Sequence, residues 1–477
     1  MAAGGMYDHI GGGFHRYATD ARWLVPHFEK MLYDNAQLAS LYLDGFQVTG
    51  KRALAQVARE ILDYLLREMT APEGGFYSAT DADSPVPGGH EEEGWFFTWT
   101  PAEIEAVLGA DRARLVAAYY QITPVGTFEG RSILHTPSPI EAVARSLKMA
   151  PAVLEQEVAA AKGQLYAARK KRPPPLLDDK ILTAWNGLAI SALSQGAFIL
   201  DDGRYAEAAR RAADFVLQKM RTTNGRILRS FRAGQARHDG TLDDYAFFIQ
   251  GLLDLFEATF ELRWLEGAVP LQRDLDQLFF DPTGGGYFPT SADAEKLLTR
   301  EKPAYDGAEP SGNSVALVNL LRLYELTTEA GYRQRAEKTF AAFAGDLGDG
   351  GPGVPKMLAA LDLYLDSPLE ILIVSPPGGS AADLLAPLRK RYLPNRILAS
   401  AQSGPALQEL AEVIPLLAGK KPLGPKPTAY VCERGRCELP TSDPAVFARQ
   451  IAKTRPLFDD HSPAPLPQGS QAVRTGP

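Results

Sequence analysis

Amphipathic helix pairs repeat along the first three quarters of the chain. In the first pair, from about Tyr33 to Met69, apolar side chains of the second helix share one face: Leu54, Val57, Ala58, Ile61, Leu62, Leu65 and Met69. Apolar residues three and four positions apart are typical of a helix with one buried face. Further helix pairs with the same pattern begin at Trp185, Asp243 and Gly312. One such pair cannot bury its apolar face alone, so the pattern predicts stacking of each pair on its neighbours.

Short segments of glycine and aromatic residues separate the helix pairs. The segments are Gly12-Gly13-Phe14, Gly74-Gly75-Phe76-Tyr77 and Gly285-Gly286-Tyr287-Phe288. Glycine reaches backbone angles that tight turns require, so we expect short extended turns between the pairs. This punctuation favours a closed ring of helical hairpins over an open solenoid. Four hairpins are clear in the pattern, and one or two more are weaker.

The rest of the chain departs from this plan in two places. Between about residues 85 and 180 we expect helices at Pro101–Leu108, Arg112–Tyr120 and Pro151–Arg169. After Pro368 strands alternate with helices, which indicates a small α/β unit with strands at Glu370–Val374, Asn395–Ala399 and Thr428–Cys432 and helices at Ala381–Arg391 and Ala406–Leu417. We therefore expect a hairpin toroid over residues 1–367, an α/β subdomain over 368–455 and a disordered tail over 456–477.

Composition narrows the function. The net charge of −8 argues against nucleic acid and anionic membranes as partners, and no apolar run is long enough for a membrane span. The first six residues lack the features of a secretory signal. Cys432 and Cys437 are the only cysteines, so we expect reduced or structural thiols and a cytoplasmic protein. Their spacing fits neither a thioredoxin-type pair nor a zinc site, and no cofactor or metal motif is present.

A ring of hairpins brings distant polar residues together. The first helix of each pair lies inside, so the starts of all inner helices face one rim. Candidate catalytic residues in these segments are His15, His27, Glu29, Asp34, Asp179, Asp243, Asp244 and Glu309; candidate ligand-binding residues are Trp23, Tyr77, Asp81, Asp83, Trp95, Trp185, Asn186, Tyr245 and Asn313. Aromatic faces beside carboxylates suit a sugar. The competing interpretations are plain helix capping by Asp and Asn and aromatic side chains that fill the ring.

Two chemistries are compatible with these residues. An epimerase needs a base and an acid on opposite faces of its substrate, and His15 or His27 with His238 could supply them. A glycoside hydrolase needs two carboxylates, about 5–5.5 Å apart for retention or about 6.5–9.5 Å for inversion. The sequence gives no distances, so the pair stays open.

Seven long motifs, in a fixed order along the chain, resemble those of a known protein family. They are Gly11–Tyr17, Val25–Asp34, Gly75–Ser78, Asp81–Ser84, Leu177–Gly187, Leu242–Ala246 and Asp306–Ser314. Together they closely resemble the YyaL-like family of thioredoxin-domain-containing proteins that includes spermatogenesis-associated protein 20, over about residues 4 to 455. The resemblance implies a mostly α fold, an (α/α)6 toroid of the six-hairpin glycosidase and N-acylglucosamine 2-epimerase type, preceded in the family by a thioredoxin-like domain. The chain starts where the toroid starts, so we expect neither that domain nor its redox cysteines.

Three functional hypotheses follow. The first is a carbohydrate-active enzyme, epimerase-like or glycosidase-like, with a small sugar ligand at one rim and no cofactor. The second is a non-catalytic binding module that was formerly coupled to a redox domain, and it predicts a rim plugged by its own side chains. The third is a decayed fragment that folds poorly. The oligomeric state stays open.

Overall fold

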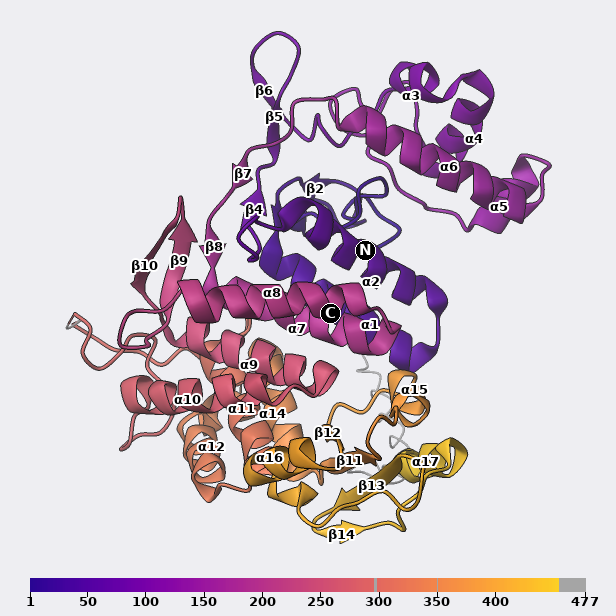
Figure 1. Cartoon of the computed structure of the whole chain (residues 1–477). Coiled ribbons are helices and arrows are strands. Elements are labelled where there is room, and N and C mark those ends of the chain that lie inside the picture. Colours follow the sequence, from indigo (N-terminus) through magenta and orange to yellow (C-terminus); the bar gives the residue numbers. More distant parts are fainter. Residues whose placement is uncertain (296–297, 350, 454–477) are drawn as a thin grey trace, which may run out of the picture.

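The computed structural model describes residues 1–295, 298–349 and 351–453, and within them the chain is a ring of helices of the six-hairpin toroid type (Figure 1). Four antiparallel helix pairs form most of it: α1 (Leu32–Thr49) with α2 (Arg52–Tyr64), α7 (Thr183–Leu200) with α8 (Gly203–Lys219), α9 (Leu242–Thr259) with α10 (Leu262–Phe279), and α11 (Gly312–Thr327) with α12 (Ala330–Ala342). The helix α14 (Pro355–Leu365) packs on α11 as a fifth inner helix. The four predicted hairpins are confirmed.

The inner helices start on one side of the ring. Asp306 Oδ1 and Oδ2 accept hydrogen bonds from the backbone of Ser311, beside α11, and of Lys356 in α14, both at 2.8 Å. Asp244 of α9 accepts from the backbone of Ala184 in α7, and the rings of Tyr33 (α1) and Trp185 (α7) lie 4.8 Å apart. The first turns of α1, α7, α9, α11 and α14 therefore gather at one end of the ring, which we call the mouth.

Three buried asparagines explain why the helix pairs follow glycine–aromatic segments. Asn35 accepts from the backbone N–H of Phe14 at 2.7 Å and donates to its carbonyl at 3.0 Å. Asn186 holds Phe76, and Asn313 holds Tyr287, in the same two-bond arrangement. Each asparagine lies in the first turn of an inner helix and satisfies the backbone of the segment that precedes its hairpin.

The glycines of these segments are required by close packing. Gly12 has φ +74°, and a Cβ there would lie 2.5 Å from the carbonyl oxygen of Glu60 in α2. Gly285 has φ +70° and presses on the backbone of Lys338 in α12 in the same way. Each segment is thus clamped between the inner and the outer helix of the hairpin that follows it.

Residues 101–169 form a separate helical lobe, seen at the top right of Figure 1. It contains α3 (Pro101–Leu108), α4 (Ala110–Tyr120), α5 (Ile140–Ser146) and α6 (Pro151–Arg169), which share an apolar core of their own. The predicted helices correspond to α3, α4 and α6; α5 was not predicted.

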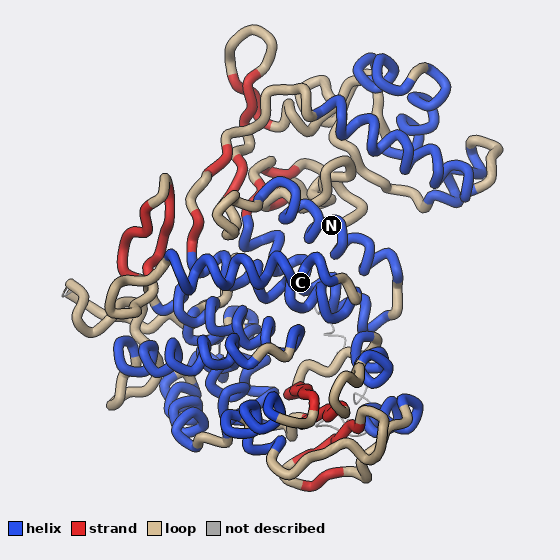
Figure 2. Tube along the Cα trace, in the orientation of Figure 1, coloured by secondary structure: helices blue, strands red, loops and turns tan. Residues whose placement is uncertain are grey.

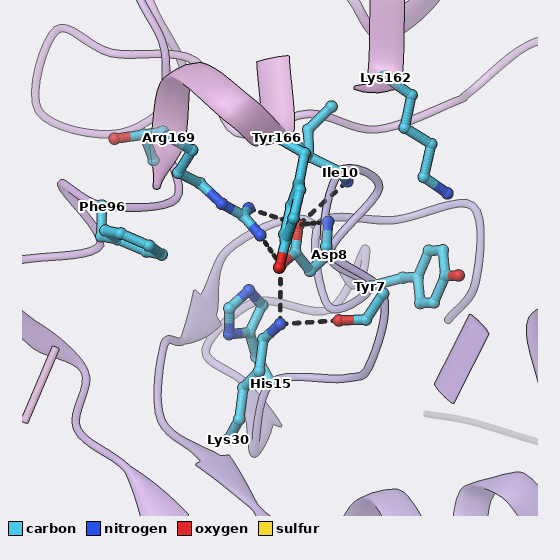
Figure 3. Close-up of polar contacts among 12 residues, drawn as sticks. Tyr7, Asp8, Ile10, His15, Lys30, Phe96, Lys162, Tyr166 and Arg169 are labelled. Atoms are coloured by element: carbon cyan, nitrogen blue, oxygen red, sulfur yellow. Dashed lines mark hydrogen bonds and ion pairs between the residues drawn. The ribbon is translucent and has the colours of Figure 1, made fainter. Parts of the chain in front are cut away.

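A buried ion cluster fastens this lobe to the N-terminal segment (Figure 3). Arg169 of α6 donates to both oxygens of Asp8 at 2.8 Å, and Lys30 Nζ lies 2.7 Å from Asp8 Oδ2. The two cations hold the pKa of the Asp8 carboxyl well below its usual range, against the effect of burial.

The C-terminal unit is a four-stranded sheet in the order β12-β11-β13-β14, with β11 parallel to β12 (Figure 2). Its strands are β11 (Leu369–Ser375), β12 (Arg396–Gln402), β13 (Thr428–Glu433) and β14 (Arg436–Cys437), and its helices are α15 (Ala382–Arg389), α16 (Pro405–Val413) and α17 (Pro444–Gln450). The predicted strands match β11 to β13. Gln47, near the end of α1, donates to the carbonyls of Leu388 and Arg389. The unit therefore closes the end of the ring opposite the mouth.

The remaining elements are short. They are β1 (Tyr17–Ala18), β2 (Pro26–His27), β3 (Lys30–Met31), η1 (Leu65–Met69), β4 (Ala79–Thr80), β5 (Asp83–Pro85), β6 (Glu91–Glu93), β7 (Leu177–Asp178), β8 (Ile181–Leu182), β9 (Leu228–Arg232), β10 (Gln235–Asp239), α13 (Ala344–Asp349), η2 (Gly351–Gly353), η3 (Pro415–Leu417) and η4 (Ile451–Lys453). The predicted tail over 456–477 lies outside the described residues.

The expectation of reduced cysteines is wrong. Cys432 and Cys437 face each other across the β13–β14 hairpin, with Cα atoms 3.9 Å apart, and they form a disulfide. Directly opposed residues of an antiparallel pair come close enough for this bond. The argument for a cytoplasmic location from the two cysteines therefore does not hold. None of the described helices is long and apolar enough to cross a bilayer.

Candidate functional site

The mouth brings a carboxylate and an indole together. Trp185, in the first turn of α7, donates its Nε1 hydrogen to Glu309 Oε2 at 2.8 Å, and Glu309 lies in the loop before α11. The ring of Tyr33 packs edge-on against Trp185, and the next residue, Asp34, lies in the first turn of α1. Trp185 and Glu309 are half-buried, so one aromatic face and one oriented carboxylate are presented at the same opening.

A chain of polar contacts extends this pair toward the β5–β6 hairpin. Arg16 donates to Glu29 Oε2 at 2.8 Å and to the hydroxyl of Tyr33 at 3.3 Å. His27 lies between two carboxylates, with Nε2 3.1 Å from Glu29 and Nδ1 2.7 Å from Glu93. These contacts fix the orientation of the His27 imidazole and place Glu29 between two basic groups. Glu93 was not among the predicted residues.

Asp34 has the most unusual environment at the mouth. Its Oδ2 atom is buried and has no hydrogen-bond partner among the described residues. Burial raises the pKa of Asp34 to about 7; Arg16 opposes the rise, and the nearby carboxylates Glu309 and Glu29 add to it. A carboxyl with this pKa can both give and take a proton near neutral pH.

Glu309 lies close enough to both Asp34 and Asp243 for its charge to interact with theirs. Burial raises the pKa of Glu309, the hydrogen bond from Trp185 opposes the rise, and the charge of Asp243 adds to it. Burial also raises the pKa of Asp243, against the charge of Arg229. The mouth thus collects three carboxyl groups whose pKa values are all raised by burial, and perturbed carboxyl groups of this kind cluster at functional sites.

Five predicted residues lie in structural positions. Asn186 and Asn313 are fully buried, and their amides are engaged by the glycine–aromatic segments. Asp244 accepts from the backbone of Thr241 and Ala184, and Tyr245 accepts from the backbone of Ile227. His15 is 2% exposed, beside the Asp8 cluster (Figure 3), and burial lowers its pKa to about 3. We leave these five side chains out of the candidate site.

The remaining predicted residues are spread over other surfaces. Asp179 pairs with Arg232 at 2.5 Å, Trp95 lies under the guanidinium groups of two arginines, and Trp23 is 46% exposed. The others are Tyr77, half-buried, and Asp81, Asp83 and His238, all exposed. Within the described chain, none of these side chains makes a hydrogen bond or ion pair with Asp34, Trp185 or Glu309.

Below the mouth, the ring encloses a cavity of about 510 Å³, the chamber, lined mainly by α1, α7, α9, α11 and α14. Its lining begins at Gln37 and Pro310, next to the mouth residues Asp34 and Glu309, and reaches Arg396 of β12 at the far end. The sequence analysis missed it. The signal was present, because Ser191, Ser194, Gln250 and Asp254 place polar groups three or four positions apart on otherwise apolar helices.

The described residues contain no group of three or more His, Cys, Asp or Glu side chains placed to hold a metal ion.

Comparison with known proteins finds relatives that match most of this chain. No protein-family model matches the chain. Spermatogenesis-associated protein 20 of Homo sapiens is 37% identical over 94% of this chain, and that of Mus musculus is also 37% identical over 94%. The resemblance to the spermatogenesis-associated protein 20 family is confirmed. The chain spans about 61% of the length of these relatives.

Solved structures with the same kind of fold are more distant. A sugar epimerase from a ruminal bacterium covers 71% of this chain and 82% of its own at 11% identity, with a TM-score of 0.40. A D-mannose isomerase covers 70% and 81% at 14% identity, with a TM-score of 0.36. A cellobiose 2-epimerase from Bacillus thermoamylovorans covers 71% and 82% at 9% identity, with a TM-score of 0.39.

Proposed function

We propose that the chain is a carbohydrate-active enzyme whose active site is the mouth, with glycosidase-like acid–base chemistry. The observation that carries the proposal is Asp34, a carboxyl with a pKa of about 7 and an unpartnered buried oxygen, beside the oriented carboxylate of Glu309. A protonated carboxyl paired with a second carboxylate is the minimum that glycoside hydrolysis requires.

The roles follow from the environments. Asp34 supplies the proton to the leaving oxygen, because its carboxyl is the one held protonated near neutral pH. Glu309 acts as the second carboxyl group, because the indole hydrogen bond from Trp185 fixes the orientation of its Oε2 atom at the mouth. Trp185, which is half-buried and backed by the buried ring of Tyr33, offers aromatic surface to the apolar side of a sugar ring. Glu29, held by Arg16 and His27, positions the far edge of the site.

An epimerase and a non-catalytic module have less support. An epimerase mechanism with two catalytic histidines would have only His27 at the mouth. His15 is buried near Asp8, and His238 is exposed on the β9–β10 hairpin. A purely structural module predicts a plugged rim, whereas the interior of the ring holds a cavity of about 510 Å³ whose lining includes Gln37 and Pro310.

The proposal is tested with a panel of neutral mono- and disaccharides incubated with the purified chain and followed by ¹H NMR. We expect new reducing ends from at least one disaccharide, and loss of that conversion in Asp34→Asn and Glu309→Gln, while both variants still unfold cooperatively on heating. Conversion of a sugar to its epimer would replace the glycosidase assignment with an isomerase. Absence of any conversion would remove the catalytic proposal.

A further inference from the structure

The far half of the chamber has one wall of fully paired charges. Arg322 of α11 donates to Asp254 at 2.7 Å and to Glu257 at 3.0 Å, both on α9. Arg396 lies 3.8 Å from Glu257. The side chains of Arg322, Asp254 and Glu257 are only 11 to 14% exposed. These cations already have anionic partners, so this wall has little attraction left for a further negative charge.

Asp44 and Lys356 lie in the same chamber without such partners. Asp44 belongs to α1 and Lys356 to α14, and neither side chain makes a hydrogen bond or ion pair with any described residue. The two charges nevertheless interact. Burial raises the pKa of Asp44 to about 6, and the ammonium of Lys356 opposes this rise. Burial lowers the pKa of Lys356, and the charges of Asp254, Asp44 and Asp306 oppose that change.

A third group in the chamber is also unsatisfied. The Gln250 side chain donates to Ser191 at 3.2 Å, but its carbonyl oxygen is buried and has no hydrogen-bond partner in the described chain. Buried polar groups are normally paired, and leaving them unpaired costs free energy. The Gln250 oxygen is closed off from solvent, whereas the Asp44 carboxyl and the Lys356 ammonium belong to the lining of one cavity and are groups that water or a ligand satisfies.

The chemistry of these groups points to hydroxyls. A hydroxyl donates one hydrogen bond and accepts two, so hydroxyls of one ligand can donate to Asp44 and accept from Lys356. Leu188, Phe198 and Leu363 add apolar surface to the same walls. The cavity volume lies in the range of small-molecule sites. A phosphate would place two negative charges near Asp44, Asp254 and Glu257, with Lys356 as the one lining cation outside an ion pair in the described chain.

We propose that the chamber is a binding site for an uncharged polyhydroxylated molecule of mono- or disaccharide size, held by Asp44 and Lys356. The inference extends the mouth inward and rests on the proposed function for the sugar class of the ligand. It assigns the two residues to ligand binding, with no part in bond cleavage.

The test is equilibrium binding, measured by isothermal titration calorimetry with D-mannose, cellobiose and mannose 6-phosphate. The proteins are the full chain, Lys356→Met and Asp44→Asn, with the exposed-site variants Lys171→Met and Asp111→Asn as matched controls. Loss of a charge-assisted hydrogen bond predicts binding weaker by about tenfold or more in each chamber variant and unchanged in each control. Circular dichroism melts confirm folding.

Each outcome has a defined meaning. Binding of a neutral sugar that weakens in both chamber variants supports the inference. No binding of either neutral sugar, binding unaffected by both substitutions, or tighter binding of mannose 6-phosphate overturns it. The Asp34→Asn variant separates the two proposals, because it should bind the sugar and not convert it. Chamber-dependent binding without turnover by the unaltered chain would contradict the proposed function alone.

Discussion

Trp185 donates its indole hydrogen to Glu309, 124 positions further along the chain, at 2.8 Å. The bond joins the start of the second inner helix to the loop before the fourth. It exists because both helices begin at the mouth, and it gives Glu309 a fixed orientation beside Asp34.

Replacing this indole tests its role. Trp185→Phe keeps the aromatic face and removes the donor, so the pKa of Glu309 should rise further from its ordinary value and turnover should fall. A hydrogen bond to a charged group is worth roughly 1.5–3 kcal/mol, which corresponds to about a 10- to 100-fold loss. The pH–rate profile measures both changes. The exposed Trp23→Phe is the control, and equal rates for the two variants would show that the bond is dispensable.

Asp34 should make folding stability depend on pH. Its pKa is raised from 3.8 to about 7 in the folded protein, so the folded state binds the proton more tightly than the unfolded state. That contribution is complete below about pH 4 and is lost as the pH rises through 7. Asp34→Asn should match the unaltered chain near pH 4 and exceed it at pH 8.5 by on the order of 2 kcal/mol, since partial exposure reduces the full effect.

Urea denaturation at the two pH values measures the difference. The exposed Asp111→Asn should show no pH-dependent gap. A gap of the same size in both variants would mean that burial at the mouth is not its cause.

The asparagine contacts should dominate local stability. Asn186→Ala leaves the buried N–H and C=O of Phe76 without partners, and the expected loss is about 2–4 kcal/mol. Asn186→Asp sets a buried carboxylate against the carbonyl oxygens of Phe76 and Leu182, so its loss at neutral pH should be at least as large. Thermal denaturation compares the two. A loss below about 0.5 kcal/mol in Asn186→Ala would mean that the segment is held mainly by its glycine packing.

The cysteine pair gives a chemical prediction. Thiol labelling of the denatured chain without reductant should find no free thiol, and reduction should release two, from Cys432 and Cys437. Because the disulfide closes a very short loop at the end of the C-terminal unit, reduction should leave the mouth and its sugar conversion unchanged. Two thiols before reduction would contradict the disulfide.

The fold could be predicted because its signals are local and periodic. The faces of α2 and α9 follow from apolar spacing, and the hairpin topology alone places Asp34, Trp185 and Glu309 at one opening. What escaped prediction depends on single contacts. Asn186 and Asn313 look like ligand-binding amides in sequence, and only the structure shows them bonded to Phe76 and Tyr287.

The chamber could not be predicted from the sequence for a related reason. Asp44 and Lys356 are more than 300 positions apart, and no local pattern links them. Their lack of partners is a property of the closed ring, since each helix alone would present its charge to water. The disulfide escaped because composition indicated a reducing compartment, while the register of β13 and β14 sets the two cysteines opposite each other.

The pH–rate profile of sugar conversion, compared between the unaltered chain and Asp34→Asn, tests the central claim most directly. On the sugar that the chain converts fastest, the rate should fall as the pH rises above about 7, because the carboxyl of Asp34 loses its proton. The variant should lose at least about 100-fold in rate, as expected for a general acid. An unchanged rate and an unchanged high-pH limb in Asp34→Asn would contradict the account.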